Sequence, residues 1–577
     1  MHRELCSAYL MGYERLAAWS GLLDEINVFP VADADTGRNL RISLAPLKTV
    51  FRKDTARQLL MSATGNSGNI AGAFFSKFIQ LDSCNELLGA ATEGKNAAWR
   101  ALLDPKAGTM LSVFDALVEA FDDGLGGDVG QAYEKIIDIL RSAVLQTSEL
   151  LPELRAAGVV DAGALGMFLF FEGFFMALVQ DAYRFCNPHS DFGSKIKIIR
   201  NYNQKDSNTY CIDSVIVPAE DAQSATRAIA GFGRHVVARS DGRHLKIHLH
   251  ADDDRAVRTR LAAVGNVVQW HSEKIEDGAT RPEGTLKDET GVHVVTDAAG
   301  SLSAGEAREL GVTLLDSYIL MDDLHLPESA VSIDNLYAAM RRGVKVTTAQ
   351  ASTFERRQYY EYLTQRYDRI IYLSVGSAYT GNVETARRWA AENKNGRRMT
   401  VIDTGAASGR LGLIARSVAQ FAGSGVDGSD TIRFAHEVCR RCNELVFLDQ
   451  LKYLVAGGRI SKTSGLLADM LKMKPVIRPG AHGAEKVGVV RKRRDQVVFA
   501  LKHLGGNLEG ATSVEILLQY TDNRDWVVTQ VQPRIQSLLP AARIKVAPMS
   551  ITAGAHMGPG TWAVAYLPIH GESSHTK

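Results

Sequence analysis

The spacing of apolar residues changes twice along the 577-residue chain, and this change limits the folds that the chain can adopt. Residues 1 to about 190 carry apolar residues at helical spacing between glycine-rich breaks, which predicts long amphipathic helices. Residues 195–277 switch to short alternating runs such as HLKIHLH, which predict strands between helices. From Val292 onward, strand-like runs such as VHVVTD and VTLLDSYIL, each read as one strand, alternate with helix-like runs, which is typical of a parallel α/β sheet.

These changes predict a multidomain chain. We expect a helical domain over residues 1–190, an α/β middle domain over 195–277 and a two-lobed α/β region over 290–577. The polar segment EKIEDGATRPEGTLKDETG has the composition of a linker before the last region. We place the start of the second lobe near residue 445. At about 100–200 residues per domain, the length agrees with this division.

Charge and cysteine content narrow the class of protein. The 66 Lys and Arg residues balance 65 Asp and Glu, and a net charge of +1 disfavours a nucleic-acid-binding role, which needs a basic face. The charged N-terminus disfavours a signal peptide, and the apolar run Ala164–Gln180 holds Glu172 and predicts a core helix. The six cysteines are too sparse for a disulfide framework, and Cys439 and Cys442 lack a second pair to complete a zinc site. We expect a cytoplasmic protein that acts on small molecules.

Asp33 and Asp35 stand two residues apart in the loop NVFPVADADTGRN, which starts at Asn27. Two carboxylates at this spacing can direct oxygens at one hard cation such as Mg²⁺. A loop that only caps the following helix explains the same residues equally well, since Asp and Thr are good N-cap residues. The run alone leaves both interpretations open.

Three glycine-rich runs follow, each before a helix-like segment: SATGNSGN at residues 62–69, AGTM at 107–110 and GVVDAGALG at 158–166. Small residues at a helix start leave backbone N–H groups free to bind phosphate, helped by the helix dipole. One such loop is weak evidence. With the DTG of the aspartate loop, however, four such helix entries and a carboxylate pair indicate a nucleotide site. It is not a Walker site, because no GxxxxGK[ST] occurs.

The order NVFPVADADTG, GNSGN, AGTM and GVVDAGALG resembles the ATP-binding L-type domain of dihydroxyacetone kinases, and most closely its version in the bacterial fatty-acid kinase catalytic subunit. The resemblance covers residues 1–190 and implies an antiparallel helical barrel that holds ATP and Mg²⁺ at one end. It implies that Asp33 and Asp35 bind Mg²⁺ and are the catalytic residues. The ATP-binding residues that it implies are Asn27, Thr36, Asn39, Asn66, Ser67, Gly68, Thr109 and Asp161, the last two near the nucleoside.

Three positions depart from this family pattern. Ala32 and Ala34 stand where the loop usually has Pro and Gly, and Thr64 stands where an Arg usually precedes GNSG. We expect the loss of that Arg to weaken phosphate contacts or the interaction with the acyl donor site, and so to affect the rate more than the fold. The two aspartates, which the chemistry needs most, are retained.

In the run LKIHLH, His248 and His250 stand two apart on a predicted strand and share one face, and Cys211 lies in a second strand-like run. Two imidazoles and a thiolate supply three ligands of a tetrahedral Zn²⁺ site. Spacing alone favours two polar-face histidines and a buried cysteine. The runs TYC and KIHLH, however, resemble the middle domain of the fatty-acid kinase catalytic subunit, and this implies a Zn²⁺ site at Cys211, His248 and His250.

Hydroxyl-rich turns and two basic positions stand out in the last region: TTAQAS at residues 347–352, SAYTGN at 377–382, GGRISK at 457–462 and HMGPG at 556–560. Asp297 also ends a predicted strand, where α/β sheets place ligands. Ordinary loop chemistry explains each run alone. Together, hydroxyls, an Arg and a His can bind an anion such as a carboxylate.

This combination resembles the DegV family over about residues 290–570, with LKYLVAGGRISKTSGLLADMLKMKPVI and HMGPGTWAVAY as the most specific runs. The resemblance implies two α/β lobes that bury one fatty acid, its carboxyl group held by hydroxyls at the mouth. Ala349 and Asn382 depart from the family's Ser and Thr, so that the acyl group is held differently or another long-chain acid is bound. The fatty-acid-binding residues that it implies are Thr348, Thr380, Gly381, Arg459 and His556.

Together, the resemblances imply a fatty-acid kinase joined to its own acyl carrier, which phosphorylates a bound fatty acid to an acyl phosphate. They imply ATP, Mg²⁺ and a structural Zn²⁺ as cofactors, a homodimer, and transient membrane contact for lipid exchange without a membrane span. Two alternatives remain open: a catalytically weak lipid-binding or regulatory protein, and a kinase of a small hydroxylated substrate such as dihydroxyacetone. Against the second, Thr36 stands where those enzymes usually carry a His.

Overall fold

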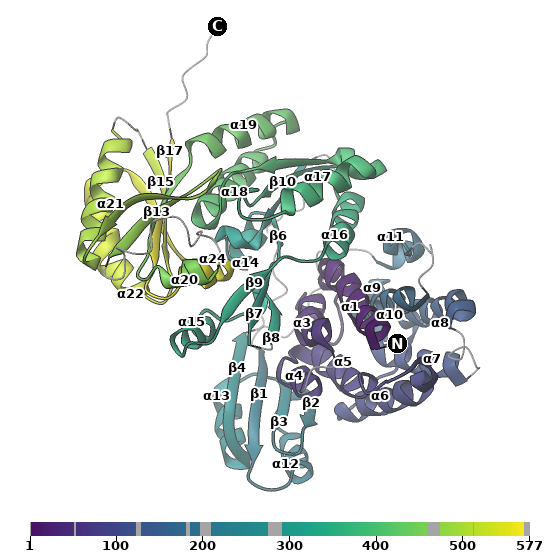
Figure 1. Ribbon diagram of the computed structural model, residues 1–577. Helices are drawn as coiled ribbons and strands as arrows, with labels where there is room; N and C mark the ends of the chain where they lie inside the picture. Colours follow the sequence, from purple (N-terminus) through teal and green to yellow (C-terminus); the bar gives the residue numbers. More distant parts are fainter. Residues whose placement is uncertain are drawn as a thin grey trace. The chain divides into compact units, whose positions relative to one another are not determined.

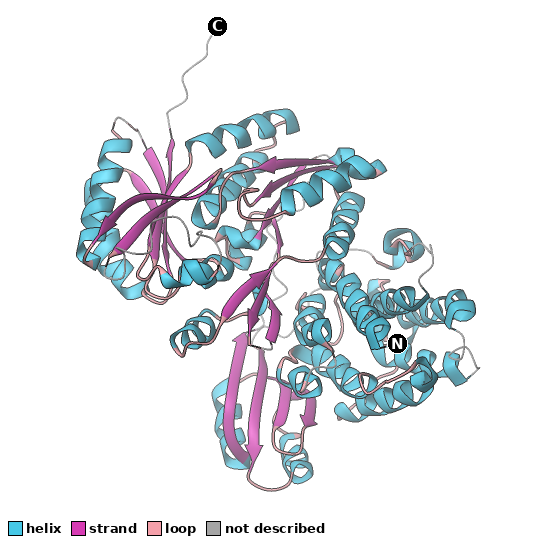
Figure 2. Cartoon of the chain, viewed as in Figure 1, coloured by secondary structure: helices cyan, strands magenta, loops and turns pink. Residues whose placement is uncertain are grey.

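The computed structural model describes residues 2–50, 54–122, 129–179, 185–196, 209–274, 291–322, 324–457, 473–509, 511 and 513–569. The chain forms two compact units, Met1–Arg281 and Pro282–Lys577 (Figure 1). The first unit is helical with one sheet, and the second holds three sheets with helices around them (Figure 2). The predicted multidomain class, helical first and α/β later, is confirmed.

The helical part of the first unit consists of α1 (His2–Ala18), α2 (Ser20–Glu25), α3 (Thr36–Ser43), α4 (Thr55–Met61), α5 (Gly65–Phe78), α6 (Leu87–Ala101), α7 (Met110–Asp122), α8 (Val129–Leu150), α9 (Pro152–Ala157), α10 (Ala162–Val179) and α11 (Pro188–Asp191). Helix α10 packs against α1, α3, α7 and α8. Among the described residues it alone is long and apolar enough to cross a membrane, and 83% of it is buried. A helix that is apolar all round and buried is a core helix, as predicted.

The core around α10 explains why this helix tolerates a charge. Phenylalanines from α5, α7 and α10 fill the interior, and the Phe74 ring stacks on Phe114 with centroids 4.0 Å apart. Glu172 of α10 pairs with Arg15 of α1, with Oε2 2.8 Å from Nη2 and both side chains buried. A buried carboxylate is tolerated when a cation and further donors offset its loss of hydration.

The sheet of the first unit comprises β1 (Tyr210–Pro218), β2 (Arg234–Ser240), β3 (Leu245–Ala251) and β4 (Gly265–Lys274), all antiparallel in the order β2-β3-β1-β4. With α12 (Ala222–Ile229) and α13 (Asp254–Val264) it forms the predicted middle α/β region. Every residue of β3 is buried. Its apolar side chains join a core with residues of α12 and α13, while the alternate residues Lys246, His248 and His250 share the face opposite. Strands β1, β2 and β3 also pack against α5.

The first lobe of the second unit contains a parallel sheet, β11-β10-β5-β6, and a small antiparallel sheet, β8-β7-β9. Their strands are β5 (Val292–Asp297), β6 (Thr313–Leu315), β7 (Tyr318–Met321), β8 (Leu324–Pro327), β9 (Val346–Ala349), β10 (Arg369–Ser374) and β11 (Met399–Asp403). The helices are α14 (Ala304–Glu309), α15 (Ile333–Arg341), α16 (Thr353–Arg366), α17 (Asn382–Glu392), α18 (Ser408–Gly423) and α19 (Gly428–Arg441).

The run VTLLDSYIL, which the sequence predicts as one strand, is split between two sheets. Asp316 and Ser317 separate β6 from β7. The buried guanidinium of Arg356 donates a hydrogen bond to the Asp316 carbonyl at 3.0 Å, so that this carbonyl is not free for either strand ladder. The expectation of one strand was therefore wrong.

The second lobe is a six-stranded sheet in the order β14-β13-β12-β17-β15-β16. Its strands are β12 (Asn443–Phe447), β13 (Lys474–Gly480), β14 (Gly483–Val490), β15 (Ser513–Tyr520), β16 (Ala542–Pro548) and β17 (Trp562–Ile569). Its helices are α20 (Lys452–Ala456), α21 (Arg493–Asn507), α22 (Arg524–Trp526), α23 (Gln532–Leu538) and α24 (Ile551–Met557). Helix α18 contacts β5 of the first lobe and β12, β15 and β17 of the second, so it joins the lobes.

Candidate functional site

The aspartate loop between α2 and α3 gathers oxygen ligands. Asn27 Nδ2 donates to Asp33 Oδ1 at 2.7 Å, and Asp33 shares a hydrogen bond with Asp35. Burial and then the charge of Asp35 raise the pKa of Asp33 well above its usual range. Asn27 Oδ1 is buried and has no hydrogen-bond partner in the described part of the chain. Two neighbouring carboxylates and an unpaired amide oxygen suit a hard cation, so the residues fit the predicted Mg²⁺.

Asp24 in α2 supports this loop, although no sequence motif points to it. Its Oδ1 accepts hydrogen bonds from the amides of Gly37 at 2.7 Å and Arg38 at 3.0 Å, and so caps α3 from a different helix. Burial raises the pKa of Asp24 to about 7. Because Asp35 directly precedes α3, this cap fixes the backbone that carries Asp35.

The predicted phosphate-binding residues lie where the starts of α3 and α5 meet. A Cβ at Gly65, where φ is 64°, would lie 2.1 Å from Asn39 Nδ2, so the position requires glycine. A Cβ at Gly68 would lie 2.0 Å from the Ser43 hydroxyl of α3. Thr36, Asn39 and Ser67 are buried, and Asn66 Oδ1 is buried without a partner in the described part of the chain. Their amide and hydroxyl groups are suited to phosphate.

Thr109 and Asp161 lie at the starts of α7 and α10. Asp161 accepts a hydrogen bond from the Ala164 amide at 2.7 Å and another from the first amide of α7, next to Thr109. Burial raises the pKa of Asp161 to about 7. Val159 packs against Val28 of the aspartate loop, so these residues and the loop lie at one end of the helical part.

The predicted zinc ligands also come together. Cys211 and His250 are register partners on β1 and β3, and the ligand atoms of Cys211, His248 and His250 lie within 4.8 Å of one another. His248 Nε2 and His250 Nδ1 are buried and have no hydrogen-bond partner among the described residues. Burial, followed by the charge of His248, lowers the pKa of His250 well below its usual range. A neutral imidazole with an unpaired ring nitrogen fits a metal ligand.

The thiol of this cluster lies near the aspartate loop. Burial raises the pKa of Cys211, and the charges of Asp213 and Asp35 raise it further. Asp213 lies opposite His248 in the register of β1 and β3. Although burial would raise its pKa, the charges of Lys246 and His248 bring the pKa of Asp213 below its usual range. Asp213 therefore lies beside the cluster and, through the Gly65 amide, at the start of α5.

The second unit contains a cavity of about 350 Å³, lined by residues from the first lobe and from α20, β13, β14 and α24. Its apolar lining includes Leu454, Ile477, Pro479, Ala484 and Met557. Its polar lining includes Asp297, Ser317, Thr348, Thr380, Asn382, Ser408, Thr552 and His556. A mostly apolar cavity with a few polar groups is the usual form of a small-molecule site.

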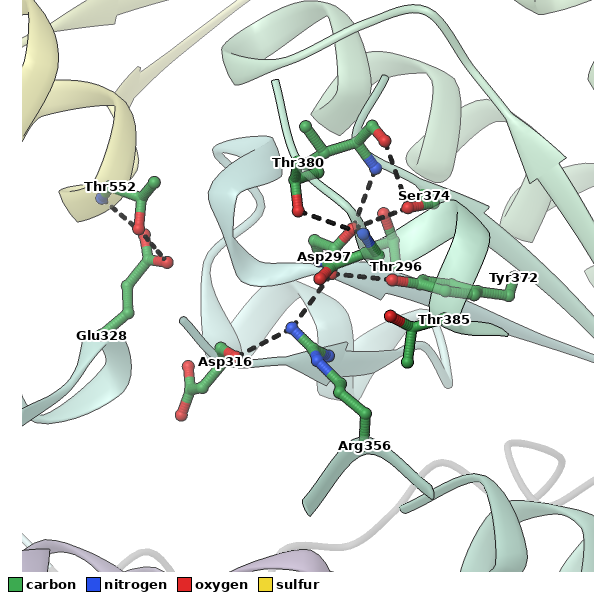
Figure 3. Close-up of polar contacts among 12 residues, drawn as sticks. Thr296, Asp297, Asp316, Glu328, Arg356, Tyr372, Ser374, Thr380, Thr385 and Thr552 are labelled. Atoms are coloured by element: carbon green, nitrogen blue, oxygen red, sulfur yellow. Dashed lines mark hydrogen bonds and ion pairs between the residues drawn. The ribbon is translucent and has the colours of Figure 1, made fainter. Parts of the chain in front are cut away.

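Asp297 anchors the polar end of the parallel sheet, with Tyr372, Ser374 and Arg356 around it (Figure 3). Both Asp297 and Arg356 are buried. The carboxylate accepts from the Val375 amide at 2.8 Å, the Tyr372 hydroxyl and Asn382 side-chain amide at 2.9 Å, the Ser374 hydroxyl at 3.3 Å and Arg356 Nη2 at 3.4 Å. Asn382, a departure from the family pattern, therefore holds the sheet end.

Thr348 and His556 meet in the cavity wall, where Oγ1 of the first lies 3.0 Å from Nε2 of the second. Thr348 lies in β9 and not in the predicted turn. A Cβ at Gly457 would lie 2.3 Å from His556 Nδ1, so the glycine lies against the ring. Helix α24, which carries His556, is held by Glu328, which accepts the amide of Thr552 at 2.8 Å and its hydroxyl hydrogen at 2.7 Å (Figure 3).

The other predicted lipid-binding residues differ in position. Thr380 lines the cavity, and its Oγ1 accepts a hydrogen bond from the backbone amide of Asn382 at 3.2 Å. Gly381 precedes α17 and is not part of the described cavity wall. Ala349 lines the cavity without a hydroxyl. Arg459 lies outside the described residues.

Sequence reasoning missed Ser408 in the cavity wall. It starts α18 with φ 52°, and its hydroxyl donates to Gln519 Oε1 at 3.1 Å. A signal was present, because the run TGAASGR after the strand MTVIDT is a small-residue helix entry like those of the first unit. Ser317 and Thr552 had no such signal, since they reach the cavity only through the packing of β7 and α24.

Two family models match the chain. The DAK2 domain matches residues 30–176, and the model described as "Uncharacterised protein, DegV family" matches residues 291–569. An uncharacterized protein of Staphylococcus saprophyticus is 25% identical over 299 residues, covering 46% of this chain and 54% of that protein. One of Staphylococcus epidermidis is 24% identical over 344 residues, covering 53% and 62%. The chain thus spans about half the length of the curated relatives it matches.

The solved structures that resemble this chain include a fatty-acid-binding DegV family protein from Thermus thermophilus, with 23% identity, a TM-score of 0.46, and coverage of 48% of this chain and 100% of that one. DegV, a fatty acid binding protein from Bacillus subtilis, has 16% identity, a TM-score of 0.45 and the same coverage. The fatty acid kinase B3 protein of Streptococcus pneumoniae, loaded with linoleic acid, has 17% identity, a TM-score of 0.42 and the same coverage. By its two family matches, the chain carries a DAK2 domain in its helical part and a DegV-family domain in its C-terminal half.

Proposed function

We propose that this chain is a fatty-acid kinase that carries its acyl carrier in the same polypeptide. It transfers the γ-phosphoryl group of ATP to the carboxylate of a bound fatty acid and gives acyl phosphate and ADP. The observation that carries the proposal is the presence of a DAK2 domain and a DegV-family domain in one chain. The cavity of the second unit, apolar with hydroxyls and an imidazole in its wall, supports the carrier role.

In the first unit, Asp33, Asp35 and Asn27 hold Mg²⁺. When bound there, Mg²⁺ neutralises charge on the β- and γ-phosphates. The backbone amides at the starts of α3 and α5, with Thr36, Asn39, Asn66, Ser67 and Gly68, bind the phosphates. Thr109 and Asp161 lie against the nucleoside.

In the second unit, Thr348, Thr380, Arg459 and His556 bind the fatty-acid carboxylate, and Leu454 and Met557 contact the acyl chain. A carboxylate oxygen attacks the γ-phosphorus, the bond to the β–γ bridging oxygen breaks, and ADP leaves. A fatty-acid carboxylate is already ionised at pH 7, so no general base is required. Catalysis is then positioning and charge stabilisation. Covalent linkage of carrier and kinase raises their effective concentration, to about the mM range for a short flexible linker.

We further propose that Cys211, His248 and His250 hold a structural Zn²⁺, as their unpaired ring nitrogens support. Elemental analysis that finds no zinc in the pure protein would rule this out. A cytoplasmic location, a homodimer and transient membrane contact for lipid exchange stay predictions.

The kinase proposal is tested by incubating the pure protein with Mg-ATP and oleate or palmitate and trapping acyl phosphate with hydroxylamine. We expect a fatty-acid-dependent hydroxamate from the wild type and at least a hundredfold less from Asp35→Ala, since the metal ligand is lost. No product from the wild type rejects the kinase. Native mass spectrometry for a co-purified fatty acid tests the carrier half separately.

A second candidate is a catalytically weak lipid-binding protein. Two observations favour it: Ala34 has φ 54° in the aspartate loop, and Thr64 stands where an Arg usually precedes GNSG. The strained loop and the missing Arg both reduce phosphate handling, and neither affects the cavity of the second unit. A co-purified fatty acid without acyl phosphate formation supports this candidate.

A further inference from the structure

One carboxylate of the sheet in the first unit, that of Asp213 on β1, contacts the candidate phosphate loop, residues 62–69. Its Oδ2 accepts the Gly65 amide at 3.2 Å and the Thr64 hydroxyl at 3.1 Å. Its Oδ1 lies 3.5 Å from Lys246 Nζ on β3, and both side chains are only 7% exposed. A single carboxylate therefore separates a buried ammonium group from the first amide of α5.

This contact is built into the packing of the sheet along α5. Eight residues C-terminal to Thr64, Gly72 leaves room for Arg239 of β2, whose Nη2 donates to the Gly72 carbonyl at 2.8 Å. Val237 of β2 packs against Ala73 of α5. Asp213 is thus held at the start of the helix by contacts along its length.

Lys246 reduces the repulsion that Asp213 would exert on an anionic ligand at the start of α5. A carboxylate at the start of α5 places negative charge beside the amides that the proposed function assigns to phosphate, and this opposes phosphate binding. Lys246 offsets that charge, and Asp213 is its single ion-pair partner among the described residues. An ammonium group has three donors, so Lys246 retains capacity for a further acceptor. If the contact between the sheet and α5 served only stability, a buried ion pair would add little to it.

We propose that Lys246 binds the nucleotide phosphates and that Asp213 is a positioning residue, which holds Thr64 and Gly65 at the start of α5. Lys246 then supplies the positive charge that an Arg at the position of Thr64 would supply. The sheet is thereby part of the nucleotide site. This inference rests on the proposed function for the location of the phosphates, and its test measures binding, not turnover.

The test measures the affinity of the full-length protein for Mg-ATP and for adenosine by isothermal titration calorimetry. For Lys246→Met we expect about 10- to 100-fold weaker Mg-ATP binding, the range of a lost hydrogen bond to a charged group, with adenosine affinity unchanged. Lys246→Arg restores Mg-ATP affinity to within a few fold. The control Arg243→Ala removes the same charge from an exposed position between β2 and β3 and leaves both affinities unchanged.

For Asp213→Asn we expect faster amide hydrogen exchange at residues 64–68. The melting temperature of each variant shows whether the fold is kept, and Lys246→Gln replaces the Met variant if that one does not fold. The inference is overturned if a folded Lys246 variant binds Mg-ATP like the wild type, or if it loses adenosine affinity equally.

Failure of the proposed function gives a different result. A wild type that binds Mg-ATP but forms no acyl phosphate rejects the kinase, while the Lys246 comparison still decides this inference. A wild type that does not bind Mg-ATP overturns both.

Discussion

Two aspartates, a half-buried one in the first unit and a buried one in the second, show how differently the two units use a carboxyl group. Asp33 in the first unit receives the Asn27 amide but faces a second carboxyl group, Asp35, and its pKa is raised. Asp297 in the second unit receives five donors, one of them a guanidinium. Burial of a carboxylate therefore does not mark a ligand site. A carboxylate that lacks hydrogen-bond donors and nearby positive charge does mark a ligand site, because a bound cation can supply the missing positive charge.

Glu328 and Glu444 of the second unit are intermediate between Asp33 and Asp297, because they have several donors but no paired positive charge among the described residues. Glu328 accepts two hydrogen bonds from Thr552, and Glu444 accepts the Gly409 and Arg410 amides at the start of α18, but neither has an ion-pair partner in the part of the chain that the structure describes. Burial raises the pKa of each to about 7. Donors without a counter-charge thus hold a carboxyl group in place but do not keep it ionised at low pH.

The largest effect is expected from the loss of Asp297, the aspartate that accepts hydrogen bonds from five donors. Asp297→Ala leaves the guanidinium of Arg356 buried without its carboxylate, and we expect the free energy of unfolding of the second unit to fall by about 3–5 kcal/mol. Chemical denaturation followed by tryptophan fluorescence measures it. As control, Glu384→Ala removes an exposed pair with Arg388 and costs less than about 1 kcal/mol. Equal losses in both variants would refute the contrast.

The next effect is a pH dependence at Glu328. Its pKa is raised from 4.5 to about 7, so the folded state keeps a proton that the unfolded state has lost between these values. The stability contribution is full below pH 4.5 and is lost as the pH rises to about 7, a change of roughly 3 kcal/mol. Glu328→Gln removes this loss. Unfolding curves at pH 4.5, 5.5, 6.5 and 7.5 measure it, and parallel pH profiles for variant and wild type would contradict the assignment.

A smaller effect of opposite sign is expected at Asp33, the aspartate that has few donors and faces a second carboxyl group. In Mg²⁺-free buffer at pH 7, Asp33→Asn removes a half-buried charge beside Asp35, and we expect the first unit to gain about 1–2 kcal/mol in unfolding free energy. Addition of Mg²⁺ raises the melting temperature of the wild type but not of the variant. A destabilised Asp33→Asn, like Asp297→Ala, would mean that both aspartates are structural.

The smallest effect concerns the backbone of the same loop. Ala34 has φ 54°, a conformation that costs an L-residue more than glycine. We expect Ala34→Gly to stabilise the protein by about 0.5–1 kcal/mol and to tighten Mg²⁺ binding, as thermal unfolding with and without the ion shows. Ala32→Gly is the matched control, since Ala32 has no positive φ, and it gives no gain. A gain from both substitutions would argue against local strain.

The sequence identified residues that act together within one segment. Asp33 and Asp35 share a loop, and the alternation of LKIHLH placed His248 and His250 on one face, which the structure buries. It did not reveal Asp24 capping α3 or Asp213 holding Thr64, because these partners lie 13 and 149 residues away and only packing brings them together.

The second unit shows the same limit. The alternating pattern correctly predicted the parallel sheet, but it merged β6 with β7, since the Arg356 contact that ends β6 comes from 40 residues further along the chain. The hydroxyls of Thr347 and Thr348 suggested a turn, whereas pairing with β7 makes this segment a strand. Local composition cannot show which distant strand will pair.

The start of helix α5 belongs to the candidate phosphate loop, and the same helix is the surface against which the sheet of the first unit packs. The natural place to divide the chain, where helices give way to strands near residue 190, therefore lies inside a single compact unit. A shortened protein that ends there would lose Asp213 and the Arg239 contact and expose the side of α5 that they cover. Exchange of modules between such proteins should then keep the helices and the sheet together and join new partners only beyond residue 281.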